Sequence, residues 1–590
     1  MTSDPTAASP TQQPSPAAAT ATLSLDAAFQ LAQSHRAAGR HESAERIFRN
    51  ILQAVPDHPQ ALFLLGVMAL HFNRNDVAEL RFRAVLRQRP HNVHALAGLA
   101  SALHELGRSA EAERAARKSI ELDGANAQAH SALGRILLTR SRHAEASACF
   151  ARAVALEPRD PSLMTGLLYC MGQDEAVEPE QLALMHRQFG KKFGANVPDR
   201  VRQHANVRDP DKRLRVGFVS GDLREHAVAH FVEPVWREFD RKRIELFAYS
   251  NSRIEDASTQ RLKAQVDEWR AVSTLDDAQL ARQIQADGID ILVDLSGHTV
   301  GNRLLVFARK PAPVQASSIG YSETTGLTAI DYHLCSIHAA PPGAIDSFYV
   351  EKLVRLHASG AFEPDPRAPE VNPLPALKRG HVTFGSLNRL SKFGASVVPT
   401  WGRVLLAVPG SRLLLGNVAD DQAGEELRQR FAEQGITADR LRFEPRRPMD
   451  AYLRLHHDID IMLDTFPYTS GTTAKHALWM GVPIITLAGQ RRSERGGTAN
   501  VSRVGLEGWS VTSLDAYVAR ALEAANDLTG LAALRASLRE RIANSPLRQA
   551  SNVARSQEFA FRIMWQRWCA GLPPEAFNVT LEQALQTAPH

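Results

Sequence analysis

The sequence predicts an α-helical solenoid followed by two doubly wound α/β lobes. Three observations support this fold class. Residues of the same kind recur every 34 positions in the first third of the chain, short β-branched runs alternate with helical segments after residue 211, and a proline-rich gap divides that second region in two. At 590 residues the chain is too long for a single core, so several structural units are expected.

The first residues of the chain differ in composition from the rest. Residues 1–24 are rich in Pro, Ala, Ser and Thr, which predicts a disordered tail. This tail lacks a charged start followed by an apolar core, so we do not expect a signal peptide. No apolar run in the sequence reaches the length that a membrane span needs. These features favour a cytoplasmic location and no membrane partner.

A 34-residue period organises residues 25–165. Small residues let paired helices approach closely, phenylalanines fill the gap, and prolines end the second helix. The four registers are Pro56, Pro90, Gly124 and Pro158; Ala44, Ala78, Ala112 and Ala146; Phe48, Phe82 and Phe150 with Ala116; and Gly66 and Gly134. This unit resembles the tetratricopeptide repeat, whose arrays usually hold an extended peptide in a groove. A spacer or a dimerisation arm is the alternative.

After connecting helices predicted for residues 166–210, the pattern becomes that of parallel strands with helical crossovers. Strands are predicted at 214–220, 245–250 and 291–297 in a first lobe, 211–370, and at 382–388, 411–417, 440–445, 459–464 and 483–489 in a second, 371–552. Five prolines between 362 and 379 indicate a linker. The helical segment in 553–590 is expected to pack across the lobes through Ala560, Ile563, Met564 and Trp568. Two such lobes leave a cleft between them.

Several function classes are disfavoured. There is no GxGxxG after a first strand and no GxxxxGK[ST], which argues against a dinucleotide oxidoreductase and a P-loop ATPase. Lys and Arg exceed Asp and Glu by only 69 − 64 = 5 and are scattered, so no nucleic-acid partner is expected. The four cysteines form no CxxC pair, which gives no sign of a disulfide framework or a zinc site: Cys149, Cys170, Cys335 and Cys569.

Polar residues follow two predicted strands of the first lobe. His226 and His230 are spaced i, i+4, a spacing that suits a metal, but no third ligand stands at a recognisable distance in sequence. His226 is therefore a candidate for binding an oxyanion or moving a proton, with a structural histidine as the alternative. His298 and Thr299 follow the strand predicted at 291–297 and place polar groups at its carboxyl end.

The second lobe has two candidate phosphate contacts. Asn388, Arg389 and Lys392 follow its first strand, where backbone N–H groups and a cation would meet a phosphate. Gly471, Thr472 and Thr473 precede an apolar helix; in isolation they would be a helix cap. Free N–H groups at a helix start also favour an anion, and no paired carboxylates stand ready to hold a metal. Together these segments predict a metal-free diphosphate site.

The motifs "VGFVSGDLREH", "GHTVGNRL", "PAPVQASSIGY", "FGSLNRLSK" and "DTFPYTSGTTAKHALWMGVPIITL" resemble the O-linked N-acetylglucosamine transferase family, which includes plant SPINDLY proteins and bacterial homologues. The resemblance spans residue 25 to about residue 570. It implies the two-lobed GT-B architecture and an inverting transferase that needs neither metal nor cofactor. The expected donor is a UDP-sugar carrying N-acetylglucosamine, and the expected acceptors are Ser and Thr hydroxyls of proteins held along the repeats.

The resemblance also implies residue roles. His226 matches an active-site histidine that acts as base or as positioning residue, Lys392 matches the lysine that neutralises the departing diphosphate, and Thr472 and Thr473 match threonines that hydrogen-bond it. Arg447 and Pro448 fall where backbone groups read uracil. Tyr452 falls where an aromatic ring stacks on the base. The nucleotide-sugar site further comprises Asn388, Arg389, Met449, Gly471 and His476, and the sugar or acceptor pocket His298, Thr299 and Tyr321.

The sequence departs from the family pattern at several of these positions. His476 replaces an acidic residue on the ribose, Arg389 replaces a glutamine, and Ser322 and Glu323 replace Pro-Gly near the sugar. The segment "SERGGTANVSR" also differs. These departures keep two alternatives in view: a transferase with another donor, such as UDP-glucose or a GDP-sugar, and a nucleotide-binding repeat scaffold with little turnover. A homodimer formed through the repeats is left open.

Overall fold

The computed structural model describes residues 24–37, 39–195 and 197–586, and the chain divides after Pro90 into two compact units. The predicted disordered tail lies outside the described residues except for Ser24. The first unit contains two helix pairs: α1 (Leu25–Ala37), α2 (His41–Ala54), α3 (Pro59–His71) and α4 (Asn75–Gln88). The second unit begins with two more pairs and two connecting helices: α5 (Val93–Glu105), α6 (Ser109–Leu122), α7 (Ala127–Thr139), α8 (His143–Leu156), α9 (Pro161–Met171) and α10 (Pro179–Phe189).

The repeat registers do what their residue types predict. A β-carbon on Gly66 would lie 2.8 Å from the Phe82 ring, and one on Gly134 would lie 2.9 Å from the Phe150 ring, so each glycine makes room for the phenylalanine of its partner helix. The four register alanines are completely buried. Each pair of helices turns through one residue with a left-handed φ: Gly39 (73°), Asn73 (55°), Gly107 (77°) and Ser141 (60°). The predicted tetratricopeptide packing is confirmed.

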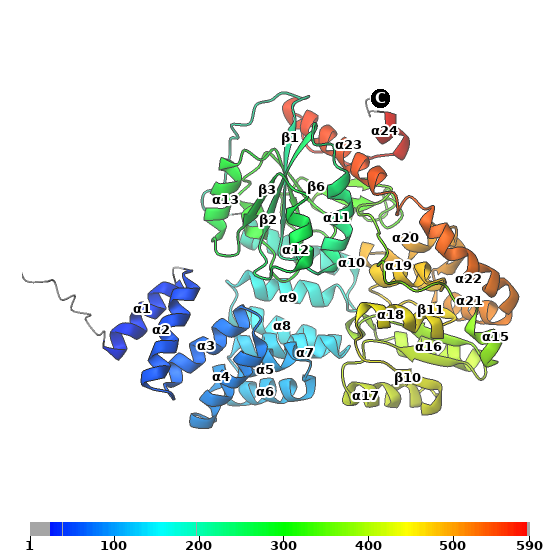
Figure 1. The fold of residues 1–590 in the computed structure, drawn as a ribbon, viewed down its shortest axis with the longest axis horizontal. Coiled ribbons are helices and arrows are strands. Elements are labelled where there is room, and N and C mark those ends of the chain that lie inside the picture. Colours follow the sequence, from blue (N-terminus) through cyan, green and yellow to red (C-terminus); the bar gives the residue numbers. More distant parts are fainter. Residues whose placement is uncertain (1–23, 38, 196, 587–590) are drawn as a thin grey trace, which may run out of the picture. The chain divides into compact units, whose positions relative to one another are not determined.

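The first lobe is a parallel sheet that, within the described residues, has eight strands in the order β14-β7-β6-β5-β4-β1-β2-β3. Helices alternate with its strands (Figure 1). The elements are β1 (Leu214–Ser220), α11 (Ala227–Glu238), β2 (Ile244–Ser250), α12 (Ala257–Lys263), β3 (Glu268–Ala271), α13 (Asp277–Ala286), β4 (Ile291–Asp294), α14 (Leu304–Ala308), β5 (Val314–Ser317), β6 (Tyr332–Ser336) and β7 (Lys352–Leu356).

The second lobe is a parallel sheet with the strand order β10-β9-β8-β11-β12-β13 among the described residues. Its elements are α15 (Pro375–Arg379), β8 (Thr383–Ser386), η3 (Leu390–Lys392), α16 (Val397–Ala407), β9 (Arg412–Leu415), α17 (Asp421–Ala432), β10 (Leu441–Phe443), α18 (Met449–Leu455), β11 (Ile461–Leu463), α19 (Thr472–Trp479), β12 (Ile484–Leu487), α20 (Gly496–Ser502), β13 (Ser510–Val511), α21 (Leu514–Asn526) and α22 (Leu528–Ala543). Tetratricopeptide repeats followed by two parallel α/β sheets give the predicted solenoid and GT-B architecture.

The chain passes between the lobes twice. It enters the second lobe through the proline-rich segment after β7, and it returns to the first lobe through α23 (Ala550–Cys569; Figure 1). After α23 come β14 (Phe577–Asn578), which pairs with β7 at the edge of the first sheet, and α24 (Leu581–Gln586). The two crossings are hydrogen-bonded: Phe362 N–H donates to Leu547 O at 2.9 Å, and Arg548 donates to Phe362 O at 3.0 Å. The second lobe is therefore an insertion into the first.

Some local predictions differ from the structure. The strand predicted at 291–297 ends at Asp294, because the Asp294 carboxylate accepts hydrogen bonds from the N–H groups of Ser296 (3.0 Å) and Gly297 (2.8 Å) and turns the chain. The predicted linker ends in a short helix, α15. Helix α23 packs on α11, β5 and β7 of the first lobe, and Ile563 and Trp568, expected on its buried face, are half-buried while Phe561 and Trp565 are fully buried.

Helix α10 contacts the first lobe through backbone atoms, at two glycines that have no side chain to keep the segments apart. Gly326 has a φ of +76°, and a β-carbon there would overlap the carbonyl of His186, while a β-carbon on Gly190 would overlap the carbonyl of Gly326. Beside this contact the His186 ring lies 3.0 Å from the Tyr321 hydroxyl. The connecting helices are therefore joined to the first lobe at a distance that only glycine permits. Among the described residues, every helix is too short or too polar to span a bilayer.

Candidate active site

Asp464 shapes the bend that follows β11. Its carboxylate is completely buried and accepts hydrogen bonds from the N–H groups of Thr465 and Ser470, both at 2.9 Å, and from the Thr486 hydroxyl at 2.8 Å. One side chain thus joins the beginning and the end of the bend to strand β12. Sequence reasoning did not single out Asp464, although an acidic residue directly after an apolar strand was visible. This bend leads into the start of α19.

The start of α19 has no side chain that caps it from the N-cap position, because the N-cap residue is Gly471. The helix begins at Thr472, and Thr472 and Thr473 are half-buried. Unpaired N–H groups in the first turn and the positive end of the helix dipole attract an anion. The geometry therefore suits the phosphate-binding alternative of the sequence prediction: both threonines lie at the first turn, and the Thr473 hydroxyl also hydrogen-bonds Tyr452.

Lys392 reaches the same bend from another strand end. Strands β8 and β11 are neighbours in the sheet, so the turn η3 that follows β8 lies beside the bend that follows β11. Lys392 Nζ donates to Thr469 O at 3.0 Å and lies 4.7 Å from the centre of the Tyr468 ring. Burial, and secondarily the positive charge of Arg389, lowers the pKa of Lys392 to about 7, against the opposing charge of Asp464.

A second lysine, the buried Lys475, was not predicted. It lies in the first turn of α19, its Nζ is 3.4 Å from Gly471 O, and it lies 4.6 Å from the centre of the Phe231 ring of α11 in the first lobe. Burial, Arg503 and Lys392 lower the pKa of Lys475 to about 7. The sequence could have indicated this residue, because Lys475 lies among the apolar residues Ala474 and Leu478 on the face of α19 that is buried.

Asn388 contributes an unpaired acceptor next to the Lys392 turn. The side chain is 2% exposed, and its Oδ1 has no hydrogen-bond partner within the described residues. Its Nδ2 has one weak contact with Ser386 Oγ at 3.5 Å. A buried amide oxygen without a partner costs free energy, so a site that keeps one is suited to a ligand with a hydrogen-bond donor.

His226 faces the second lobe from the start of α11. It is the N-cap residue of that helix, with Nδ1 accepting from Val228 N–H at 3.3 Å and lying 3.7 Å from Asp222 Oδ2. Burial lowers the pKa of His226; Arg224 and Arg389 of the second lobe lower it further, while Asp222 opposes them. The imidazole is therefore neutral near neutral pH. His230, its i+4 neighbour, bonds instead to Glu225 Oε1 at 2.9 Å.

The residues assigned to the nucleoside include a pair one turn further along α19. His476 Nδ1 lies 3.3 Å from the Tyr452 hydroxyl, and the Tyr452 ring is edge-on to the His476 ring at 5.5 Å. Burial, then Lys475 and His230, lowers the pKa of His476 to about 4, so this ring is neutral and can hydrogen-bond hydroxyl groups. Arg447 and Pro448 are exposed and Met449 is half-exposed at the start of α18, where Arg447 pairs with Glu444 at 2.8 Å.

The residues assigned to the sugar or acceptor pocket belong to the first lobe and lie beside the connecting helices. His298 is completely buried; its Nε2 donates to Thr325 O at 2.9 Å and its Nδ1 lies 3.3 Å from the Thr165 hydroxyl of α9. Tyr321 is 5% exposed and bonds His186 of α10. Thr299 donates its hydroxyl to Ser296 O at 2.9 Å. The structure packs His298 and Tyr321 against the connecting helices, and Tyr321 also lies near enough to Tyr468, the neighbour of Lys392, for that residue to affect its pKa.

Two of the departures from the family pattern contact each other. Glu323 Oε1 of the first lobe accepts a hydrogen bond from Ser493 N–H of the second lobe at 3.1 Å, and Arg492 donates to Ser322 O at 3.2 Å. The altered segments "GYSETTG" and "SERGGTANVSR" therefore lie next to each other where the two lobes meet. Because they contact each other, a departure from the family pattern in one segment favours a matching departure in the other. Within the described residues no group of three or more His, Cys, Asp or Glu side chains could hold a metal ion.

Comparison of the chain with known proteins finds similar families and structures. The model of "Glycosyl transferase family 41" matches residues 197–362 and 374–556, and a tetratricopeptide repeat model matches residues 29–80. A solved structure of an O-GlcNAc transferase mutant from Thermobaculum terrenum is 34% identical, with a TM-score of 0.82 over 87% of this chain and 98% of that one.

Curated relatives agree with this assignment. A protein from Solanum lycopersicum named "Probable UDP-N-acetylglucosamine--peptide N-acetylglucosaminyltransferase SPINDLY" is 37% identical over 421 residues, which is 69% of this chain and 44% of the relative. The SEC protein of Arabidopsis thaliana, whose name states the same activity, is 32% identical over 64% of this chain and 39% of its own length. The chain therefore spans less than half the length of these relatives.

Proposed function

Because the chain belongs to glycosyl transferase family 41, we propose that it transfers N-acetylglucosamine from a UDP-sugar to Ser and Thr hydroxyls of protein substrates. The reaction proposed is an inverting displacement without a metal ion. The acceptor oxygen bonds to the anomeric carbon from the face opposite the diphosphate, the bond from that carbon to the diphosphate oxygen breaks, and the hydroxyl proton is released. UDP leaves with the electron pair of the broken bond and one more negative charge than it had in the donor.

The observation that carries this proposal is the pair of lysines beside the open start of α19, of which Lys475 is buried and Lys392 is half-buried. Within the described residues, Lys392 contacts Thr469 O and Lys475 contacts Gly471 O, and neither lysine has a carboxylate partner at ion-pair distance. A buried ammonium group without an anionic partner is unfavourable unless a ligand supplies the anion. Two such groups with the helix dipole match the charge that develops on a departing diphosphate.

The remaining assignments follow from this position of the diphosphate. Thr472 and Thr473 would hydrogen-bond it, and one turn further along α19 the neutral His476 with Tyr452 would contact the ribose and the base. Asn388 and Arg389 would contact the phosphate or sugar from the turn before Lys392. Arg447, Pro448 and Met449 would read the edge of uracil through their backbone. His298, Thr299 and Tyr321 remain predictions for the sugar pocket. Protein acceptors would lie along the repeats.

Calorimetry of UDP binding tests the proposal. UDP is expected to bind in the presence of a chelator, and a panel of UDP-N-acetylglucosamine, UDP-glucose and GDP-sugars is expected to give transfer only with the first, scored on peptide acceptors by mass spectrometry. Absence of UDP binding contradicts the enzyme assignment. If transfer occurs only from another donor, the sugar of that donor takes the place of N-acetylglucosamine in the proposal. If UDP binds but no donor is transferred or hydrolysed, the result supports the scaffold alternative instead.

Changing His226 to alanine separates catalysis from nucleotide binding. His226 lies in the first lobe and the diphosphate contacts in the second, so we expect kcat to fall about 10²-fold, within the range of general acid–base or positioning effects, while UDP affinity changes less than about 3-fold. Steady-state kinetics and calorimetry give the two values. His381→Ala, at a histidine bonded to Arg379 O, is the control. A collapse of UDP affinity would make His226 a nucleotide ligand.

The affinity for UDP-N-acetylglucosamine is expected to fall as pH rises above neutral. The pKa values of Lys392 and Lys475 are lowered to about 7 without ligand, and a bound diphosphate raises them because it stabilises the charged form. Below this pH both lysines are already charged; above it, binding requires proton uptake. We expect at least about 10-fold weaker binding at about two pH units above neutral. Lys475→Met should flatten the profile, and pH-independent binding contradicts this linkage.

A further inference from the structure

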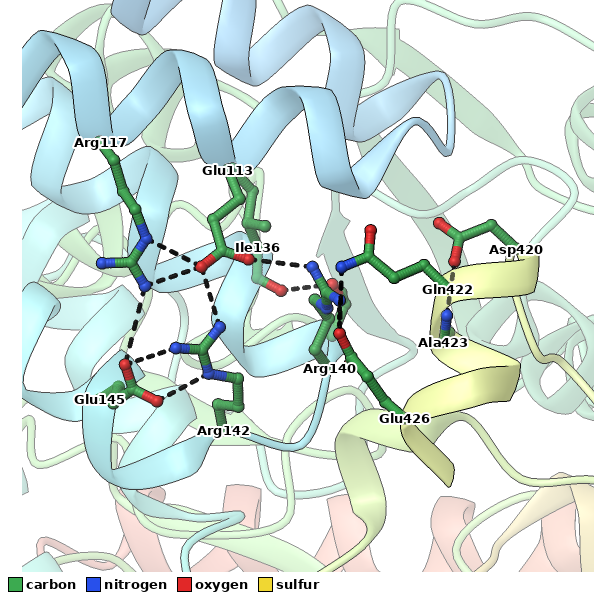
Figure 2. A network of polar contacts seen from close by, with 11 residues as sticks. Glu113, Arg117, Ile136, Arg140, Arg142, Glu145, Asp420, Gln422, Ala423 and Glu426 are labelled. Carbon is green, nitrogen blue, oxygen red and sulfur yellow. Dashed lines mark hydrogen bonds and ion pairs between the residues drawn. The ribbon is translucent and has the colours of Figure 1, made fainter. Parts of the chain in front are cut away.

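The 140–143 turn, which comprises the three residues between α7 and α8 and the first residue of α8, contacts the second lobe through three of its four residues. Ser141 Oγ donates to Leu390 O at 2.5 Å, and His143 Nε2 donates to Ser391 O at 2.8 Å. Arg140 bonds Glu426 of α17 while also bonding Glu113 of its own repeat array at 2.9 Å (Figure 2). His143 is 6% exposed and the Arg140 side chain 7% exposed, so these contacts are shielded from water.

The two carbonyl groups that accept these bonds belong to the turn that carries Lys392. Leu390 and Ser391 are the residues directly before Lys392 in η3, and Leu390 O also accepts the Phe393 N–H at 2.8 Å. The position of the Lys392 backbone is therefore held from the repeat side by Ser141 and His143. Its side chain ends 3.0 Å from Thr469 O, three residues before Thr472. A displaced turn would move the ammonium group relative to the start of α19.

Ser141 is an unusual residue for its backbone conformation. The equivalent positions of the other repeats are Gly39, Asn73 and Gly107, and all four have a φ between 55° and 77°. Glycine and asparagine adopt this left-handed region readily, whereas serine does so rarely. A strained residue that persists in one repeat needs a compensating role, and the hydrogen bond to Leu390 O supplies one. The fourth repeat differs from the others at the position that contacts the Lys392 turn.

We propose that Ser141 and His143 are positioning residues for Lys392, so that the fourth repeat sets the geometry of the diphosphate site. This inference rests on the proposed function, because it assigns Lys392 to the diphosphate. The alternative is a purely structural role, in which the two side chains only attach the repeats to the second lobe. The two roles differ in one respect: a positioning residue acts on the ligand through Lys392 and loses its effect when Lys392 is absent.

A double-mutant cycle on UDP affinity, measured by calorimetry on the full chain, distinguishes these roles. We expect His143→Ala to weaken UDP binding about 5-fold when Lys392 is present and less than about 2-fold in a Lys392→Ala background. Equal weakening in both backgrounds, or no weakening in the first, overturns the proposal. If UDP does not bind the unaltered protein, the proposed function itself fails, which is a different result from a failure of the cycle.

Conservative variants keep the test valid if the alanine variant does not fold. His143→Gln retains an N–H donor that can reach Ser391 O and is expected to recover most of the affinity. Ser141→Gly relieves the left-handed strain, so its melting temperature should not fall, yet its kcat should fall about 3-fold or more with little change in KM for the acceptor. A Ser141→Gly variant with unaltered kcat and UDP affinity contradicts the role of Ser141.

Two matched controls isolate the contact with the second lobe. His130→Ala removes a histidine of the same repeat whose ring lies 3.1 Å from a backbone carbonyl, that of Gly124, and is expected to leave UDP affinity unchanged. Asp199→Gly makes the same backbone change as Ser141→Gly at another residue with a left-handed φ, 59°, and is expected to leave kcat unchanged. An equal loss in either control would show that the effect is not specific to the 140–143 turn.

Discussion

Replacing Lys392 with alanine is expected to lower the rate of transfer at saturating donor by about 10³-fold, near the upper end of what one preorganised charge contributes at a reacting centre. The reason is that, in the proposed reaction, Lys392 faces the diphosphate as its negative charge increases. The fold should persist, because the variant removes a half-buried ammonium group that forms no ion pair within the described residues and makes one hydrogen bond, to Thr469 O. Steady-state kinetics and the melting temperature measure both effects.

The matched control for this experiment is Lys378→Ala, which removes an exposed lysine of the same lobe and should leave kcat unchanged. Lys392→Arg tests whether charge alone suffices; it should recover only part of the activity, because the larger guanidinium has to fit beside the Tyr468 ring. A Lys392→Ala variant that keeps more than about a tenth of the activity would show that the charge of the leaving group is balanced elsewhere.

Replacing Gly326 with alanine is expected to have the largest effect on stability. The added methyl group would overlap the carbonyl of His186, and the backbone on both sides of the contact cannot move aside as a flexible side chain could. The φ of +76° adds strain of about 1 kcal/mol or more. We expect loss of the folded protein from expression, or a melting temperature lower by about 10 °C or more.

Gly343→Ala provides the control for backbone strain alone. Gly343 has a φ of +80°, and a β-carbon there would meet nothing within 4 Å. Its substitution therefore includes the left-handed strain without the overlap, and about 1 kcal/mol of destabilisation is expected. Similar melting temperatures for the two variants would mean that helix α10 shifts to accommodate the methyl group, and that its contact with the first lobe is softer than the structure indicates.

The helices and strands could be predicted where a local pattern of apolar residues determines them. The strand predicted at 214–220 is β1 residue for residue, because a run of apolar residues can be buried on both faces of a parallel sheet. The edge strand β3, with the sequence EWRA, was not predicted, because its half-exposed residues carry no apolar run. The two-residue strand β14 is too short to leave any pattern and depends on pairing with β7.

The candidate site was predictable only as separate segments. The sequence identified the turn before Lys392 and the Gly471-Thr472-Thr473 start of a helix, and the neighbouring positions of β8 and β11 bring them together. Lys475, Ser141 and His143 were missed for a different reason. Their significance depends on partners far away in the chain, such as Ser391, which is 248 residues from His143. No local pattern records a contact of that kind.

The two hydrogen-bonded crossings near Phe362 and Leu547 have a mechanical consequence. Two lobes that are joined by two adjacent segments of chain can move most easily by rotating about the line through those two segments. Sliding or separation of the lobes would break the hydrogen bonds that Phe362 forms with Leu547 and Arg548. Because the connecting helices are attached to the first lobe and the 140–143 turn to the second, the same rotation has to stretch the repeat contacts. Exchange of the donor and release of the Lys392 turn are therefore expected to occur as one movement about a single pivot.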